Sequence, residues 1–347
     1  MDENTTPDPH QNDVTNTSET TATNNLQFQS RLDLSELHQS VQNIKAEVSK
    51  VIVGQTDMVD MLIAALLAKG HALIEGVPGV AKTVTAKLLA KSLSVGFSRI
   101  QFTPDLMPSD ILGTSVFNLK NTEFEFKKGP IFSNMILIDE INRAPAKTQA
   151  ALFEVMEEQQ ITIDGNKFKL DAPFMVLATQ NPVEQEGTYR LPEAQLDRFL
   201  FKIDVDYPNL EEEIEIISRE HALKDKIKTE EITSFLTAEQ IVNYQNLVTQ
   251  ILVEEHLIKY IAQLIVATRS NQFLYLGASP RASIAILKAS KAFAAMSGRD
   301  FVTPEDIKRA AIPVLHHRVI VTPEREMEGV SSKQIINQII ETVEIPR

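Results

Sequence analysis

The segment from His71 to Thr83, "HALIEGVPGVAKT", constrains the fold of this chain more than any other part of its sequence. An apolar run leads into a glycine-containing turn, and the turn leads into the helical pattern "VTAKLLAKSL". This is the order of a P-loop, in which backbone N–H groups and a helix N-terminus hold phosphates. Lys82 is expected to meet the terminal phosphates, and the Thr83 hydroxyl is expected to bind Mg²⁺. The segment therefore predicts an α/β fold that binds a nucleotide.

The turn departs from the pattern G-x-x-x-x-G-K-[ST] at one position. Ala81 stands where the second glycine is expected, so this backbone position must be reachable with a Cβ present. Considered alone, the turn is also compatible with an ordinary connection between a strand and a helix. The choice between these two interpretations depends on the rest of the sequence.

A second apolar segment, "NMILIDEIN", ends in two carboxylates. Asp139 and Glu140 would lie at the C-terminal edge of a sheet, where open α/β sheets bind ligands. Asp139 is expected to hold Mg²⁺ through water, and Glu140 to orient and deprotonate the water that attacks a γ-phosphate. An exposed acidic strand end could explain this motif alone, but not both motifs in this order. The guanine-reading N-K-x-D motif is absent, and an acid directly after Asp139 favours a hydrolase.

Three further polar residues stand at informative places. Asn181 in "VLATQNP" closes another predicted strand at the same edge, where it could bond the γ-phosphate, although Asn-Pro also starts turns. Arg198 in "LPEAQLDRFLF" could be functional, or could form an ion pair or a carbonyl cap at a helix end. Arg281 follows Ser279 and Pro280 at a predicted helix start, where a cation is unfavourable. That broken rule suggests that Arg281 reaches from a helical domain towards the nucleotide.

The pattern along the chain predicts two folded domains. The strand candidates "SRIQF", "NMILID", "FMVLAT" and "FLFKIDV" alternate with helices, which indicates a parallel sheet flanked by helices. A helix from Leu34 to Val51 and a second one ended by Gly70 precede the sheet. After Tyr207 the strand candidates stop, so residues 27–206 are predicted as the α/β domain and 207–347 as a smaller, all-α domain. Residues 1–26 are too polar to bury a core and are predicted to be a disordered tail.

Two hairpins are predicted within the α/β part. "TSVFNLKNTEFEFKKG" alternates apolar and polar residues around Asn121, and "QQITIDGNKFKL" does so around the tight-turn pair Asp164-Gly165. They are either ornamental loops or contacts for a partner or substrate.

Composition excludes several function classes. The chain has 347 residues, no cysteine and a formal net charge of −13. The missing cysteines exclude disulfides and thiolate sites, and the acidic balance disfavours stable nucleic-acid binding. No apolar run is long enough to span a bilayer, and the start is unlike a signal peptide. We therefore expect a cytoplasmic protein without membrane insertion.

Taken together, these motifs resemble an AAA+ ATPase, and most closely the MoxR family. The resemblance extends from about residue 30 to the C-terminus. The motifs that carry it are "VIVGQ", "GVPGVAKT", "DLMPSDILGT", "ILIDEINRAPAKTQAALFEVMEEQQITIDG", "ATQNP", "GTYRLPEAQLDRF" and "GASPRA". In that family an alanine at position 81 is ordinary.

The resemblance implies a role for each matching residue. Glu140 would be the catalytic base, Asn181 the sensor of the γ-phosphate, and Arg198 an arginine finger that serves the ATP of a neighbouring subunit. Arg143 in "DEINR" also matches, but without an assigned role. Thr83 and Asp139 would bind Mg²⁺. The residues expected to contact ATP are Val53, Gly54, Gly76, Val77, Pro78, Gly79, Val80, Ala81, Lys82, Thr83, Val84, Asp139 and Arg281, the last as the sensor on the lid.

The resemblance also implies partners and leaves three functions open. It implies a homo-oligomeric ring, hexameric in form, and a partner with a von Willebrand factor A domain. The first function is a chaperone that remodels or activates a client protein. The second is a motor subunit like that of magnesium chelatase, and the third is an assembly switch with negligible turnover. Glu140 and Arg198 argue against the switch. The pair His316-His317 is predicted to be packing or surface, because no third metal ligand accompanies it.

Overall fold

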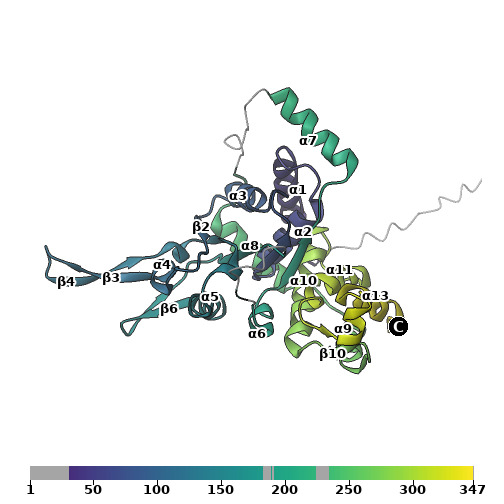
Figure 1. The fold of residues 1–347 in the computed structure, drawn as a ribbon. Helices are drawn as coiled ribbons and strands as arrows, with labels where there is room; N and C mark the ends of the chain where they lie inside the picture. Colours follow the sequence, from purple (N-terminus) through teal and green to yellow (C-terminus); the bar gives the residue numbers. More distant parts are fainter. Residues whose placement is uncertain (1–30, 183–188, 190, 224–233, 347) are drawn as a thin grey trace, which may run out of the picture. The chain divides into compact units, whose positions relative to one another are not determined.

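The computed structural model describes residues 31–182, 189, 191–223 and 234–346, so the predicted tail lies outside the described residues. A five-stranded parallel sheet in the order β2-β5-β8-β1-β9 forms its centre (Figure 1). Each strand candidate of the sequence is confirmed to within two residues. The strands are β1 (Ala72–Gly76), β2 (Phe97–Gln101), β5 (Met135–Asp139), β8 (Met175–Gln180) and β9 (Phe201–Val205).

Helices bury both faces of the sheet, and neighbouring residues of a strand point to opposite faces. In β5, Met135 and Leu137 join the core beneath the first three helices, while Ile136 and Ile138 join a second core on the other face. The first face is covered by α1 (Ser35–Ser49), α2 (Thr56–Leu67) and α3 (Lys82–Ser92). The second is covered by α4 (Pro108–Leu112) and α5 (Ala146–Glu158).

The C-terminal part is helical, as predicted, apart from one short pair of strands. β10 (Leu274–Leu276) pairs antiparallel with β11 (Ile320–Val321), which the sequence patterns did not indicate because each strand is very short. The predicted helix starts at Thr237 and Thr303 are confirmed as capping boxes. The helices are α7 (Leu210–Leu223), α8 (Ala238–Thr249), α9 (Glu255–Ser270), α10 (Pro280–Met296), α11 (Pro304–Leu315), α12 (Pro323–Met327) and α13 (Ser332–Thr342).

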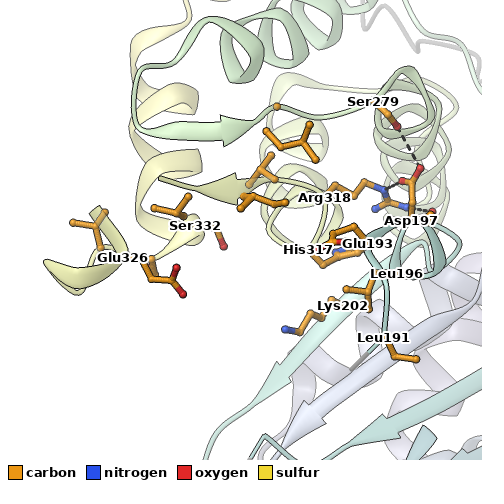
Figure 2. Close-up of a pocket in the computed structure, with 18 of the residues that line it drawn as sticks. Leu191, Glu193, Leu196, Asp197, Lys202, Ser279, His317, Arg318, Glu326 and Ser332 are labelled. Carbon is orange, nitrogen blue, oxygen red and sulfur yellow. Dashed lines mark hydrogen bonds and ion pairs between the residues drawn. The ribbon is translucent and has the colours of Figure 1, made fainter. Parts of the chain in front are cut away.

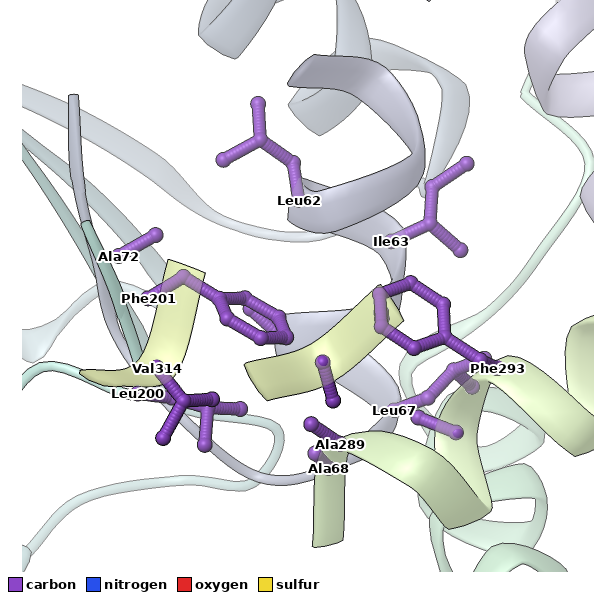
Figure 3. Close-up of a cluster of buried hydrophobic side chains, with 14 of the residues drawn as sticks. Leu62, Ile63, Leu67, Ala68, Ala72, Leu200, Phe201, Ala289, Phe293 and Val314 are labelled. Carbon is purple, nitrogen blue, oxygen red and sulfur yellow. The ribbon is translucent and has the colours of Figure 1, made fainter. Parts of the chain in front are cut away.

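The helical part shares one core with the sheet. Figure 3 shows Phe293 of α10 and Phe201 of β9 in the same cluster as the α2 side chains Leu62 and Ile63. The two phenyl rings stack with centroids 6.0 Å apart. Residues 32–347 accordingly form one compact unit, and the division at about residue 207 stays a prediction.

Both predicted hairpins are confirmed, and they contact each other. They are β3 (Gly113–Asn118) with β4 (Glu123–Lys128), and β6 (Gln160–Ile163) with β7 (Asn166–Lys169) (Figure 1). Ser115 Oγ donates to Asp164 Oδ2 at 2.6 Å, and the rings of Phe126 and Phe168 lie 4.5 Å apart.

The end of α2 corrects the expected role of Gly70. Lys69, not Gly70, adopts the left-handed conformation there, with φ of 55°. Gly70 is needed for a different reason, because a Cβ at this position would lie 2.7 Å from the Leu200 side chain. None of the described helices is long and apolar enough to cross a membrane.

Candidate nucleotide-binding site

The P-loop turn follows β1 and opens α3. Ala81 is the N-cap of α3 and adopts a left-handed backbone with φ of 60°, so the position that departs from the glycine pattern does adopt the glycine-like conformation. The Lys82 ammonium donates to the carbonyl oxygens of Gly76 and, at 3.2 Å, Val77. Burial lowers the pKa of Lys82, while Asp139, Glu140 and Glu75 oppose that shift.

A cavity of about 340 Å³ lies over this turn at the C-terminal edge of the sheet. Asp139 at the end of β5 is only 4% exposed. Its Oδ1 accepts hydrogen bonds from Thr83 Oγ at 3.2 Å and from Thr179 Oγ at 3.1 Å. The cavity is lined by Pro78, Gly79, Val80, Ala81, Lys82, Thr83, Val84, Arg99, Gln101, Asp139, Glu140, Thr179, Gln180 and Asn181.

Glu140 stands in a strained backbone conformation beside this cavity. It is a non-glycine residue with φ of 57°, a conformation that costs roughly 1–2 kcal/mol and recurs at functional sites. Gln101 Nε2 donates to Glu140 Oε2 at 3.0 Å, and Arg143 Nε lies 2.9 Å from the same oxygen. The turn after β5 therefore aims the carboxylate into the cavity, and two neighbours hold it there.

Arg99 and Gln101 are site residues that the motifs did not predict. Arg99 Nε lies 2.6 Å from Asp139 Oδ2, and Gln101 pairs in register with Asp139. The available signal was the alternation in "SRIQF", which places both polar side chains on one face of a strand that neighbours β5. Asn181, which the sequence did single out, is buried and lines the cavity.

These residues fit a nucleotide with Mg²⁺. The N-terminus of the 11-residue helix α3 and the preceding loop offer backbone N–H groups to phosphates. The Thr83 hydroxyl and the Asp139 carboxylate are oxygen ligands of the kind Mg²⁺ prefers, and they already lie within hydrogen-bond distance of each other.

Five of the expected nucleotide contacts, all among the described residues, do not line this cavity. They are Val53, Gly54, Gly76, Val77 and Arg281, the last of which lines a different cavity. Gly76 and Val77 act through the carbonyls that hold Lys82. Gly54 has φ of 68° and packs against α7, where a Cβ would lie 2.5 Å from Glu212 Oε1. The "VIVGQ" motif therefore forms the turn before α2, and its Gly54 packs against Glu212 of α7.

Arg198 and Arg281 come together at a second place. Arg198 Nη2 lies 2.9 Å from Glu157 Oε2, and Arg281 Nη2 lies 2.9 Å from Glu157 Oε1. A cavity of about 310 Å³ surrounds them. Its cations Lys69, Arg198, Arg281, Lys288 and Arg318 outnumber its carboxylates Glu157 and Asp197. The sequence motifs did not single out Glu157. Its role is visible only in the structure, because its two partners, Arg198 and Arg281, are distant from it in the sequence.

The two cavities lie at opposite ends of the strands. We call the C-terminal end of the strands the P-loop edge and their N-terminal end the Arg198 edge. β1 and β9 run parallel, with Ala72 beside Phe201 and Gly76 beside Val205. The P-loop follows the end of β1, whereas Arg198 precedes the start of β9. Five strand residues span about 16 Å, at about 3.3 Å each. Arg198 therefore lies at the opposite end of the strands from the P-loop of its own chain, and Arg281 lies beside it at Glu157.

Comparison with known proteins identifies the family of this chain. The chain matches a family described as "ATPase family associated with various cellular activities (AAA)" over residues 71–201 and an AAA lid domain over residues 266–339. It is 45% identical over 312 residues to the uncharacterized protein YeaC of Bacillus subtilis, covering 90% of this chain and 96% of that one. It is 43% identical over 310 residues to the chaperone MoxR1 of Mycobacterium tuberculosis, covering 87% and 81%. The chain belongs to the MoxR family of AAA+ ATPases.

A solved structure agrees with the fold of an ATPase. A crystal structure from Cytophaga hutchinsonii, described as a candidate ATPase, aligns with a TM-score of 0.83 at 43% identity and covers 90% of this chain and 97% of that one. In a MoxR-family chain the segment around Lys82 is the P-loop, and the C-terminal helices are the lid. ATPase activity is a trait of this family.

Proposed function

We propose that this chain hydrolyses Mg²⁺-ATP at sites shared between two copies and uses the hydrolysis to remodel or activate a client protein. The observation that carries the proposal is the separation of the two halves of the site. The P-loop, Asp139 and Glu140 lie at one edge of the sheet, and Arg198 lies at the other. A second copy whose Arg198 edge meets this P-loop edge completes the site.

In this arrangement each residue has a separate task. Lys82 and the backbone of the P-loop bind the β- and γ-phosphates, and Asn181 contacts the γ-phosphate. Glu140 takes a proton from the attacking water. Gln101 and Arg143 support this step because they hold the Glu140 carboxylate in one position. Thr83 and Asp139 would hold Mg²⁺, which neutralises charge that develops on the phosphates.

The neighbouring copy supplies cations. Arg198 leaves Glu157 to reach the γ-phosphate, and such a finger contributes on the order of 10³ to 10⁵ in rate in related enzymes. Because Arg281 shares Glu157 with Arg198, we assign it to the same neighbouring nucleotide rather than to its own. The "VIVGQ" segment at Val53 and Gly54 is assigned to the adenine.

Several features support a chaperone rather than the alternatives. A relative that is 43% identical over most of both chains is named a chaperone, which favours client remodelling over a chelatase-like motor. A carboxylate poised at Glu140 and a finger at Arg198 favour turnover over a pure assembly switch. A ring of copies, hexameric in form, and a partner with a von Willebrand factor A domain belong to this proposal.

The first test measures Mg²⁺-ATP hydrolysis per subunit over a wide range of protein concentration. Specific activity should rise with concentration as the shared sites form, and Glu140→Gln should abolish it. Activity that is independent of concentration and abolished by Glu140→Gln would refute the shared site. Activity that equals that of the variant at every concentration would refute independent hydrolysis by this chain and favour the switch.

A further inference from the structure

Arg318 is a buried arginine of the lid, and its guanidinium forms hydrogen bonds with the residues on both sides of Arg198. Its side chain is only 4% exposed, and its Nε lies 2.6 Å from Asp197 Oδ1. Its Nη atoms donate to the backbone carbonyls of Asp197 at 2.9 Å, Phe199 at 2.6 Å and Leu200 at 3.2 Å. A further bond to the Val314 carbonyl uses the fifth N–H group, so the guanidinium is fully satisfied.

A second lid residue holds the same carboxylate. Ser279 Oγ donates to Asp197 Oδ2 at 3.3 Å, so both oxygens of Asp197 bond the lid, as Figure 2 shows. Ser279 is the N-cap of α10, two residues before Arg281. The lid therefore contacts the residues on both sides of Arg198 and, through Arg281, the carboxylate that Arg198 itself binds.

We propose that Arg318 and Ser279 are positioning residues for the arginine finger, and that the lid sets the direction of Arg198 through Asp197. The inference rests on the proposed function, because it assumes that Arg198 acts on a neighbouring nucleotide. Its physical basis is that the position of a functional side chain is only as precise as the position of the backbone that carries it. A shift of the lid would carry Asp197 with it and re-aim Arg198 without any change at the P-loop of the same copy.

The chain offers a matched control within the lid. Arg299 pairs with Asp306 through two nitrogens at 2.7 and 2.8 Å, so it is a second lid arginine bound to an aspartate, although Arg318 contacts the Asp197 carboxylate through Nε alone. The contacts of Arg299 are to Asp306, Thr303 and Phe301, all within the lid. Arg299→Lys should therefore disturb an ion pair inside the lid without changing the direction of Arg198.

The test uses mixed assemblies in which each copy has one task. Copies with Glu140→Gln keep the finger but cannot hydrolyse, and copies with Arg198→Ala keep the hydrolytic site but lack the finger. Mixing the two should restore turnover at junctions between them. Arg318→Lys, which keeps the charge but loses the forked geometry, is then added to one kind of copy at a time.

The expected result is asymmetric. Arg318→Lys should lower the restored turnover at least ten-fold in the Glu140→Gln copies and leave it within two-fold in the Arg198→Ala copies. KM for ATP should be unchanged in both, because the P-loop is intact. Equal losses in both arrangements would mean a general structural role and would overturn the proposal, as would no loss in either.

Two further measurements keep the test decisive. Ser279→Ala removes a single hydrogen bond and should show the same asymmetry on a smaller scale, so it replaces Arg318→Lys if the latter does not fold. Arg299→Lys should show no asymmetry. If Arg299→Lys gives the same asymmetry as Arg318→Lys, the assignment of the positioning role to Arg318 is overturned. If the original mixture of Glu140→Gln and Arg198→Ala copies restores nothing, the shared site itself is refuted, which is a separate outcome.

Discussion

The two edges of the central sheet differ in how their residues come together. At the P-loop edge, most of the site follows directly from the ends of β1, β5 and β8, so each side chain is placed by its own strand. At the Arg198 edge, the cavity gathers the ends of α2 and α5, the segment before β9 and the lid helix α10. The first edge is built by local order in the sequence, and the second by tertiary packing.

The largest expected effect separates chemistry from binding. Arg198→Ala should lower turnover by about 10³ to 10⁵, which corresponds to about 4–7 kcal/mol of barrier, because the cation that stabilises the transition state is lost. Nucleotide affinity should stay within a few-fold. Steady-state hydrolysis beside titration with a fluorescent ATP analogue measures both, and near-normal turnover would contradict the role of the finger.

Acid should destabilise the fold through the buried histidines at the Arg198 edge. Burial lowers the pKa of His71 from its ordinary 6.5 to about 4, and also lowers the pKa of the neutral His317 beside Arg318. Between pH 6.5 and 4 the unfolded chain binds a proton that folded His71 does not, so the free energy of unfolding falls as pH falls. For His71 alone the loss is about 3 kcal/mol across that window.

Denaturant titrations at several pH values measure this slope. His71→Gln should flatten it, because the replacement side chain does not titrate. A slope that is the same in the variant and in the parent chain would show that His71 does not contribute to it.

At the P-loop edge, Lys82→Ala should weaken binding rather than chemistry. Loss of a charge-assisted contact to phosphate costs about 1.5–3 kcal/mol, which is roughly 10- to 100-fold in affinity. The same fluorescent titration measures it, with Lys91→Ala as the control because Lys91 lies in the last turn of the same helix. Unchanged affinity in the Lys82 variant would refute the P-loop interpretation.

The smallest expected effect concerns the strained turn. Ala81→Gly should stabilise the fold by about 1 kcal/mol, because glycine adopts the left-handed conformation without steric cost. Denaturant unfolding measures the gain, and Ala86→Gly, in the buried interior of α3, should instead destabilise. A loss of stability at position 81 would mean that its left-handed backbone carries no strain.

Much of the fold and one edge of the site could be predicted from the sequence. Strand ends and their following polar residues are neighbours in the chain, so the order of the motifs was enough to assign Lys82, Asp139 and Asn181 to one cavity. Arg281 was singled out as unusual and predicted to reach the nucleotide, but its pairing with Glu157 could not be predicted because the two residues are 124 positions apart in the sequence. The sequence did not indicate a role for Arg318, because a buried arginine cannot be distinguished from a surface arginine until its hydrogen-bond acceptors are known.

The parallel register of β1 and β9 also sets how sites are counted. In the shared arrangement proposed above, each copy carries one half-site at each edge, so an open row of copies holds one complete site fewer than it has members and leaves a bare half-site at each end. Only closure removes both bare ends. A row of this kind has a direction, and a single copy that lacks its finger silences one junction on one side of itself while the junction on its other side keeps working.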